Sequence, residues 1–154
     1  PGTRKRRTIH SGTSSVHAGS ARQTACMRDM EQTEELSALP EAIRASVLAA
    51  QDKKAMDVVV LDLRSGTAFT DFFVICSGQH PRQVKAIAES IEERLRRHGA
   101  RPTVVEGAGR AEWILLDFFD FVVHVFTPEV RDFYELERLW GEAERLDVSS
   151  AEPA

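Results

Sequence analysis

The hydrophobic pattern changes period several times along the chain. Over residues 36–54, apolar positions such as Ile43 and Val47 recur at helical spacing. The β-branched run 56–63 then predicts a strand, and the shorter apolar run 72–76 predicts a second, buried strand. The chain therefore starts its folded part with a helix followed by two strands.

The most regular amphipathic stripe covers residues 81–97. Pro81 stands at the first helical position, arginines occupy the last turns, and Gly99 follows where a C-cap is expected. Three strands and a helix are expected after it, at 103–106, 112–118, 121–126 and 128–144. This order predicts a single α/β domain, residues 34–148, with a mixed five-stranded sheet, packed helices and no internal repeat.

The strands at 112–118 and 121–126 are separated only by Phe119 and Asp120, so we expect a hairpin. Antiparallel partners share a sheet face, which pairs Trp113 with Phe126. The same register defines what we call the mixed face, formed by Trp113, Leu115, Asp117, Val122, His124 and Phe126. The opposite face is purely apolar.

Aromatic rings beside a carboxylate and an imidazole are typical of the centre of a protein interface. The mixed face is therefore a candidate partner-binding site. The alternative is that the terminal helices cover it, with Asp117 and His124 hydrogen-bonded to each other inside the core.

Charge is distributed unevenly around a net value of −4 over 154 residues. Residues 1–28 carry six basic side chains and no acid, whereas residues 112–148 carry ten acids and three arginines, which gives −7. An acidic surface favours a basic partner, such as a ribosomal protein, and repels bare nucleic acid.

The basic N-terminal segment lacks large apolar side chains, so we expect residues 1–33, and also 149–154, to be disordered. Three interpretations of the tail stay open: an upstream extension with Met27 or Met30 as the true start, an organelle transit peptide, or an arm that contacts RNA. No apolar run approaches the ~20 residues that cross a bilayer.

The sequence gives little support for an active site or a metal site. Cys26 and Cys76 form no C-x-x-C pair, the histidines lack metal-ligand spacing, and no G-x-S-x-G motif is present. The Ser77-Gly78 turn resembles a phosphate-binding loop only loosely, and we expect it to be a solvated turn. No catalytic residue, cofactor or metal ligand is therefore assigned.

A series of short motifs runs through residues 36–148 in a fixed order. They are Thr70-Asp71-Phe72-Phe73-Val74-Ile75, Ser77-Gly78, Arg82-Gln83-Val84, Glu106-Gly107, Trp113 to Asp117, Asp120, Val122 to Phe126, Arg131, and Phe133-Tyr134-Glu135-Leu136-Glu137 with Leu139-Trp140. In this combination the chain resembles the ribosomal silencing factor, or Iojap-like, family.

The resemblance implies an α/β fold related to nucleotidyltransferases. Those enzymes carry a Gly-Ser turn followed by paired acids, whereas here the order is Ser77-Gly78 and the next adjacent acids, Glu92 and Glu93, fall inside a helix. It therefore implies a descendant without an active site, and a nucleotide-binding or nucleotidyltransferase-like enzyme is the alternative.

The resemblance also implies a translation repressor that binds the large ribosomal subunit through its fourteenth ribosomal protein, blocks joining of the small subunit sterically and acts in large-subunit biogenesis. We expect the contact to use Trp113, Leu115, Asp117 and Phe126, with Arg131 and Tyr134 in support. The chain is then a cytoplasmic monomer or weak homodimer, or an organellar protein if the tail is a transit peptide, with a minor rRNA contact by that tail.

Two features depart from the family pattern. Phe118-Phe119 stands where an aromatic residue or leucine followed by glycine is usual, which predicts a stiffer turn. The basic tail is the second departure. Both leave the expected contact face intact.

Overall fold

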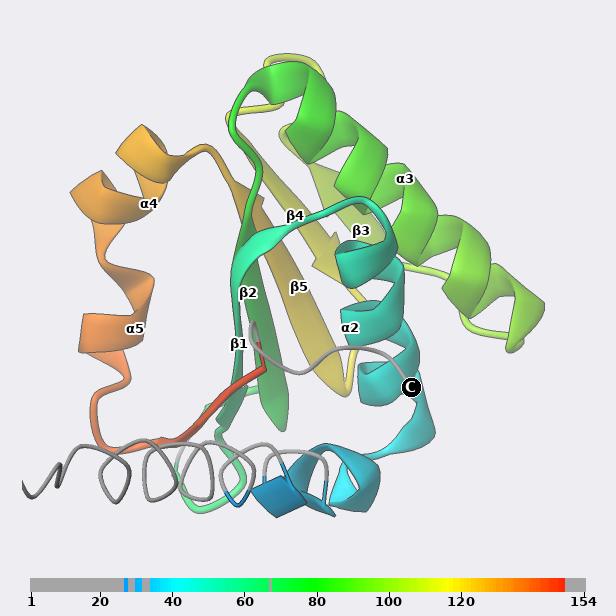
Figure 1. Ribbon diagram of the computed structural model, residues 1–154. Helices are drawn as coiled ribbons and strands as arrows, with labels where there is room; N and C mark the ends of the chain where they lie inside the picture. Colours follow the sequence, from blue (N-terminus) through cyan, green and yellow to red (C-terminus); the bar gives the residue numbers. More distant parts are fainter. Residues whose placement is uncertain (1–26, 28–29, 32–33, 67, 149–154) are drawn as a thin grey trace, which may run out of the picture.

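The structure, a computed structural model, describes residues 27, 30–31, 34–66 and 68–148 (Figure 1). The expected disorder of residues 1–33 and 149–154 therefore falls outside the described residues, apart from 27, 30 and 31. Within the described part, no helix is both long and apolar enough to cross a bilayer.

A mixed sheet of six strands in the order β3-β4-β5-β2-β1-β6 forms the centre of the fold. β2 and β5 are parallel, and the other neighbours are antiparallel. The strands are β1 (Met56–Asp62), β2 (Phe72–Ser77), β3 (Val104–Glu106), β4 (Trp113–Asp117), β5 (Phe121–Phe126) and β6 (Glu144–Asp147). The α/β class is confirmed, with one strand more than expected.

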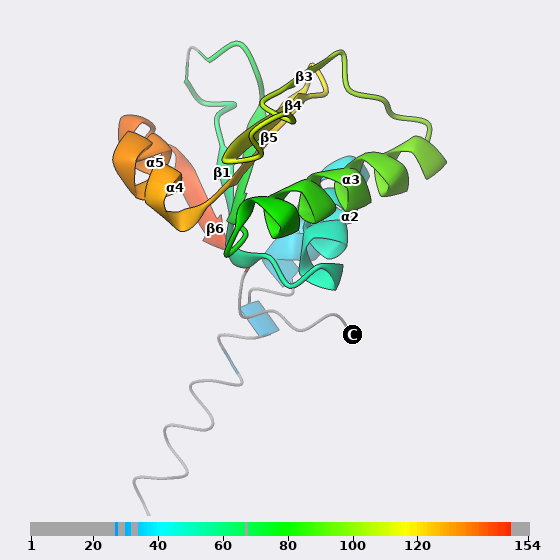
Figure 2. The ribbon, with the colours of Figure 1, turned by 90° about the horizontal axis from the view of Figure 1, so that it is seen from above.

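Helices cover both faces of this sheet. α2 (Glu41–Asp52) and α3 (Pro81–Arg97) pack on one face, and α4 (Pro128–Tyr134) and α5 (Leu136–Leu139) lie on the other (Figures 1 and 2). The larger apolar core fills the space between the sheet and α2 and α3. A smaller apolar cluster, which includes Phe126, separates the sheet from α4 and α5.

The sequence signals at α3 act as expected. Pro81 opens the helix, the His80 side chain accepts a hydrogen bond from the backbone of Gln83, and Gly99 adopts a φ of 83°. The helix expected over 36–54 is instead interrupted at Pro40, which is the N-cap of α2. Residues 34–38 form a separate helical segment because proline supplies no hydrogen-bond donor to a continuous helix.

The single helix expected over 128–144 is wrong. Glu135 has a φ of 44°, which ends α4 and separates it from α5. The chain after α5 forms β6, which pairs with the free edge of β1. Backbone pairing outweighs helical periodicity here, because the edge of β1 leaves donors and acceptors without partners until a strand adds to it.

Candidate functional site

The hairpin of β4 and β5 has the expected register, with Trp113 opposite Phe126 and Asp117 opposite Val122. The mixed face therefore exists, but its two ends differ. His124 and Phe126 are buried beneath α4 and α5, whereas Leu115, Asp117 and Val122 are half-buried. Figure 2 shows β3 and β4 extending beyond the area that α4 and α5 cover. The face is thus covered at one end and accessible at the other.

Trp113 lies at the boundary between these two ends. Its indole Nε1 donates a hydrogen bond to Nδ1 of His124 at 3.1 Å. Its ring stacks on Phe126 at a centroid distance of 4.9 Å and contacts Tyr134 at 4.8 Å. The inner edge of the indole is therefore held, and the half-buried ring presents its outer part to solvent.

Burial controls the chemistry of His124. The side chain is 4% exposed, and desolvation lowers the pKa of the imidazole to about 4. A neutral ring fits the geometry, because Nδ1 needs a lone pair to accept the Trp113 hydrogen bond. The alternative prediction of a hydrogen bond between Asp117 and His124 is wrong. Asp117 Oδ1 instead accepts from the backbone N–H of Phe119 at 2.8 Å.

α4 adds two aromatic rings, of which Tyr134 contacts Trp113. Phe133 and Tyr134 are 80% and 48% exposed and contact each other edge to face. We define the Trp113 surface by its six residues, which are Trp113, Leu115, Asp117, Val122, Phe133 and Tyr134. The sequence-based site did not include Phe133. A signal was available, because two adjacent aromatic residues in a helix point in different directions and cannot both be buried in the same core.

Two expected contact residues lie beneath this surface. Phe126 is fully buried, and Arg131 is 8% exposed. Arg131 donates to Ser77 Oγ at 2.8 Å and is ion-paired with Glu137, so it fastens α4 and α5 to the end of β2. In this conformation both residues support the surface from inside and expose little of their own side chains.

The Ser77-Gly78 turn is not solvated, which corrects our expectation. Both residues are buried, and a Cβ at Gly78 would lie 2.9 Å from the backbone nitrogen of Val84. The Ser77 hydroxyl accepts from Arg131, and the next free amide, at Gln79, donates to the side chain of Gln83. The turn thus closes α3 onto β2, and its polar groups are used within the protein.

Cys76 is fully buried, and desolvation raises the pKa of its thiol to about 12. It is therefore a protonated core residue at neutral pH. Over the ranges that the structure covers, no three His, Cys, Asp or Glu side chains come close enough together to hold a metal ion.

The C-terminal part of the chain, which carries the Trp113 surface, exposes many carboxylates. They are Glu112, Asp120, Glu129, Asp132, Glu135, Glu142, Glu144 and Asp147. Exposed aromatic rings on an acidic part of the chain are complementary to a basic protein partner that offers an apolar contact.

Comparisons with known proteins agree with this architecture. Residues 36–154 match the family model described as "Ribosomal silencing factor during starvation". The ribosomal silencing factor RsfS of Bacillus subtilis is 38% identical over 106 residues, which cover 69% of this chain and 90% of that protein.

Two further relatives extend the comparison. A crystal structure of a protein from Chromobacterium violaceum aligns with a TM-score of 0.64 and 34% identity, covering 74% of this chain and 88% of the other. A mouse protein named for mitochondrial assembly of the ribosomal large subunit is 33% identical over 93 residues, which cover 58% of this chain and 41% of that protein.

Proposed function

This chain belongs to the ribosomal silencing factor family, and on that premise we propose that it represses translation by binding the large ribosomal subunit through the fourteenth ribosomal protein. The bound chain occupies the space that the small subunit needs, so subunit joining is blocked sterically. Late large-subunit assembly is part of the same proposal, which the name of the mouse relative supports. Its place of action is the cytoplasm of a bacterium, or an organelle if the basic tail directs it there.

The observation that carries the proposal is the Trp113 surface. Tryptophan and tyrosine are the side chains that most often dominate binding energy, and here they contact each other at the boundary between the covered and the accessible ends of the mixed face. Buried His124 and Phe126 fix the indole from below, so little side-chain freedom is lost when a partner binds. The net charge of −7 over residues 112–148 favours a basic partner and orients it during encounter.

A matched pair of variants tests the contact. Tyr134 and Leu139 are both exposed apolar residues of α4 and α5, but only Tyr134 touches Trp113. Tyr134→Ala should weaken binding to the purified ribosomal protein at least about fivefold in a titration, because a central tyrosine typically contributes more than 1 kcal/mol. Leu139→Ala should bind as the wild type does.

Light scattering tests the steric step. The wild-type chain should slow association of purified large and small subunits in proportion to its occupancy, and Tyr134→Ala should do so less. A chain that binds the ribosomal protein yet leaves subunit association unchanged contradicts the steric mechanism.

The function that we propose requires no bound nucleotide. We therefore expect the melting temperature of the chain to stay constant when a nucleoside triphosphate and Mg²⁺ are added. A saturable rise would favour the nucleotidyltransferase-like alternative instead.

A further inference from the structure

A second surface of the molecule carries positive charge. Lys53 and Lys54 follow α2, and Arg82 and Lys85 lie in the first two turns of α3. All four are exposed, and within the part of the chain that the structure describes none is within ion-pair distance of a carboxylate. We call these four residues the basic edge.

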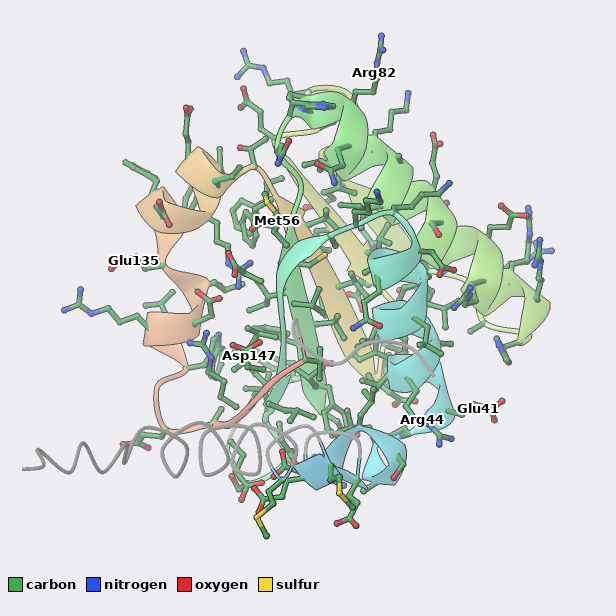
Figure 3. The ribbon with its side chains drawn as sticks, viewed as in Figure 1. Glu41, Arg44, Met56, Arg82, Glu135 and Asp147 are labelled. Atoms are coloured by element: carbon green, nitrogen blue, oxygen red, sulfur yellow. The ribbon has the colours of Figure 1, made fainter. Side chains whose placement is uncertain are left out.

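The side chain of Gln83 holds the two parts of the basic edge together. Its amide nitrogen donates to the carbonyl oxygens of Lys53 at 3.2 Å and of Lys54 at 3.1 Å. Its Oε1 accepts from the backbone of Gln79 at 2.7 Å. The turn after α2 is therefore fastened to the start of α3, where Arg82 projects away from the body of the protein (Figure 3).

Arg82 and Lys85 lie where positive charge does not stabilise α3. The first turn of α3 contains no acidic residue, although negative charge is favoured at this end of a helix. Arg82 and Lys85 instead add positive charge to the positive end of the helix dipole and to each other. A local arrangement that opposes helix stability is expected where a function requires it.

The basic edge adjoins the Trp113 surface. The backbone N–H of Gly78, just before α3, donates to the carbonyl oxygen of Phe126 at 2.9 Å, and Phe126 pairs with Trp113. The charges of the two regions nevertheless differ. Residues 41–101 contain ten Lys or Arg and eight Asp or Glu, which gives +2, whereas residues 112–148 sum to −7.

We propose that the basic edge binds the phosphate backbone of ribosomal RNA that flanks the protein contact, an inference that rests on the proposed function. Exposed, unpaired lysines and arginines without an apolar centre are suited to phosphates, which are contacted without reading sequence. A protein interface would instead bury apolar or aromatic side chains at its centre. The ribosomal protein thus meets the acidic, aromatic surface, and RNA meets the basic one.

Charge-neutralising variants test this proposal with purified large subunits. In one variant Lys53, Lys54, Arg82 and Lys85 are replaced by Gln. The control variant replaces Arg44, Arg96, Arg97 and Arg101 by Gln, so that the net charge changes equally but at the opposite ends of α2 and α3. Binding is measured by co-sedimentation between 50 and 300 mM KCl, and the fold is checked by urea unfolding.

The basic-edge variant should bind large subunits at least about tenfold more weakly, with the slope of log affinity against log salt reduced by about 2 to 4. Its affinity for the isolated fourteenth ribosomal protein should equal that of the wild type, and the control variant should keep its affinity for subunits. If the quadruple variant does not fold, the single variants Lys54→Gln and Arg82→Gln should each reduce the slope by about 1, and Arg82→Lys should restore it.

Three results overturn the assignment to RNA. They are unchanged subunit binding by the basic-edge variant, an equal loss in the control variant, and a loss of affinity for the isolated ribosomal protein, which would make the basic edge a protein contact. Failure of the proposed function is distinguishable, because the wild-type chain would then bind neither the subunit nor the isolated protein.

Discussion

The buried imidazole of His124 links the stability of the fold to pH. The unfolded chain binds a proton here below about pH 6.5, whereas the folded chain does so only below about pH 4. The free energy of unfolding is therefore complete above pH 6.5 and decreases as the pH falls toward 4. Between pH 7.5 and pH 5 we expect a loss on the order of 2 kcal/mol in urea titrations.

The variant His124→Asn is the matched control for this effect. An amide oxygen can accept the indole hydrogen bond of Trp113 and does not titrate in this range. Its free energy of unfolding should change much less between pH 7.5 and 5. Equal losses in the wild type and in His124→Asn would show that other groups cause the pH dependence.

Phe119 holds a strained backbone conformation at the tip of the β4–β5 hairpin. Its φ of 75° is sterically unfavourable for a residue with a Cβ. Its side chain is 77% exposed, so packing offsets little of this strain. Phe119→Gly should stabilise the chain by about 0.5 to 1 kcal/mol in urea unfolding. Phe119→Ala keeps a Cβ at the same φ and should change stability by less than about 0.5 kcal/mol. A destabilised glycine variant would contradict this explanation.

Side-chain alternation was sufficient to predict which residues share the mixed face. A strand has a strict period of two, and the two-residue separation of the strands fixed the register that pairs Trp113 with Phe126. The alternation of side chains along a strand does not predict which helices cover each face of the sheet. The burial of Phe126 and Arg131 depends on the backbone reversal at Glu135, which brings Glu137 back to Arg131, and no local signal in the sequence marks that contact.

The β3–β4 connection positions Trp113 through one glycine. Gly107 has a φ of 83°, and a Cβ there would lie 1.9 Å from the carbonyl oxygen of Trp113. Gly107→Ala must therefore move the start of β4, and we expect a loss of at least about 2 kcal/mol in the free energy of unfolding. Gly109 lies in the same loop with open space at its Cβ position, so Gly109→Ala should change stability by less than about 0.5 kcal/mol. Equal effects at the two positions would contradict the structure of this loop.

Arg131 connects three elements, because it bonds Ser77 at the end of β2 and Glu137 in α5 from its own position in α4. Arg131→Ala leaves the Glu137 carboxylate without its partner and should cost about 2 to 4 kcal/mol in urea unfolding. Arg138 pairs with Glu135 on the surface, so Arg138→Ala should cost less than about 0.5 kcal/mol. If Arg131→Ala were as harmless as Arg138→Ala, these contacts would not hold α4 and α5 in place.

The elements with strong local signals were predictable, and the others were formed by distant contacts. α3 carries a proline start, one apolar stripe and a glycine end, and it is found as expected. β6 has the sequence Glu-Arg-Leu-Asp, which has neither alternation nor β-branched residues. It forms a strand because it pairs with the edge of β1. This pairing depends on a distant segment and cannot be predicted from residues 144–147 alone.

Over the whole molecule, charge and apolar surface are arranged around one end of the sheet. The acidic, aromatic Trp113 surface and the basic edge adjoin there, so in the complex that we propose a single docking orientation presents each to a different component of the ribosome. This arrangement predicts that association is faster at low salt, because opposite charges steer the encounter. Stopped-flow association rates measured from 50 to 300 mM KCl should therefore decrease with salt, and salt-independent rates would contradict electrostatic steering.

Co-sedimentation with large subunits tests the Trp113 surface most directly. Trp113→Ala removes the central ring, and Leu115→Arg places a like charge against a basic partner on the accessible part of β4. Leu139→Arg introduces the same charge on α5, outside the surface. We expect the first two variants to remain folded yet fail to sediment with subunits, while Leu139→Arg sediments like the wild type. Retention of Trp113→Ala and Leu115→Arg on the subunit at wild-type affinity would contradict the account.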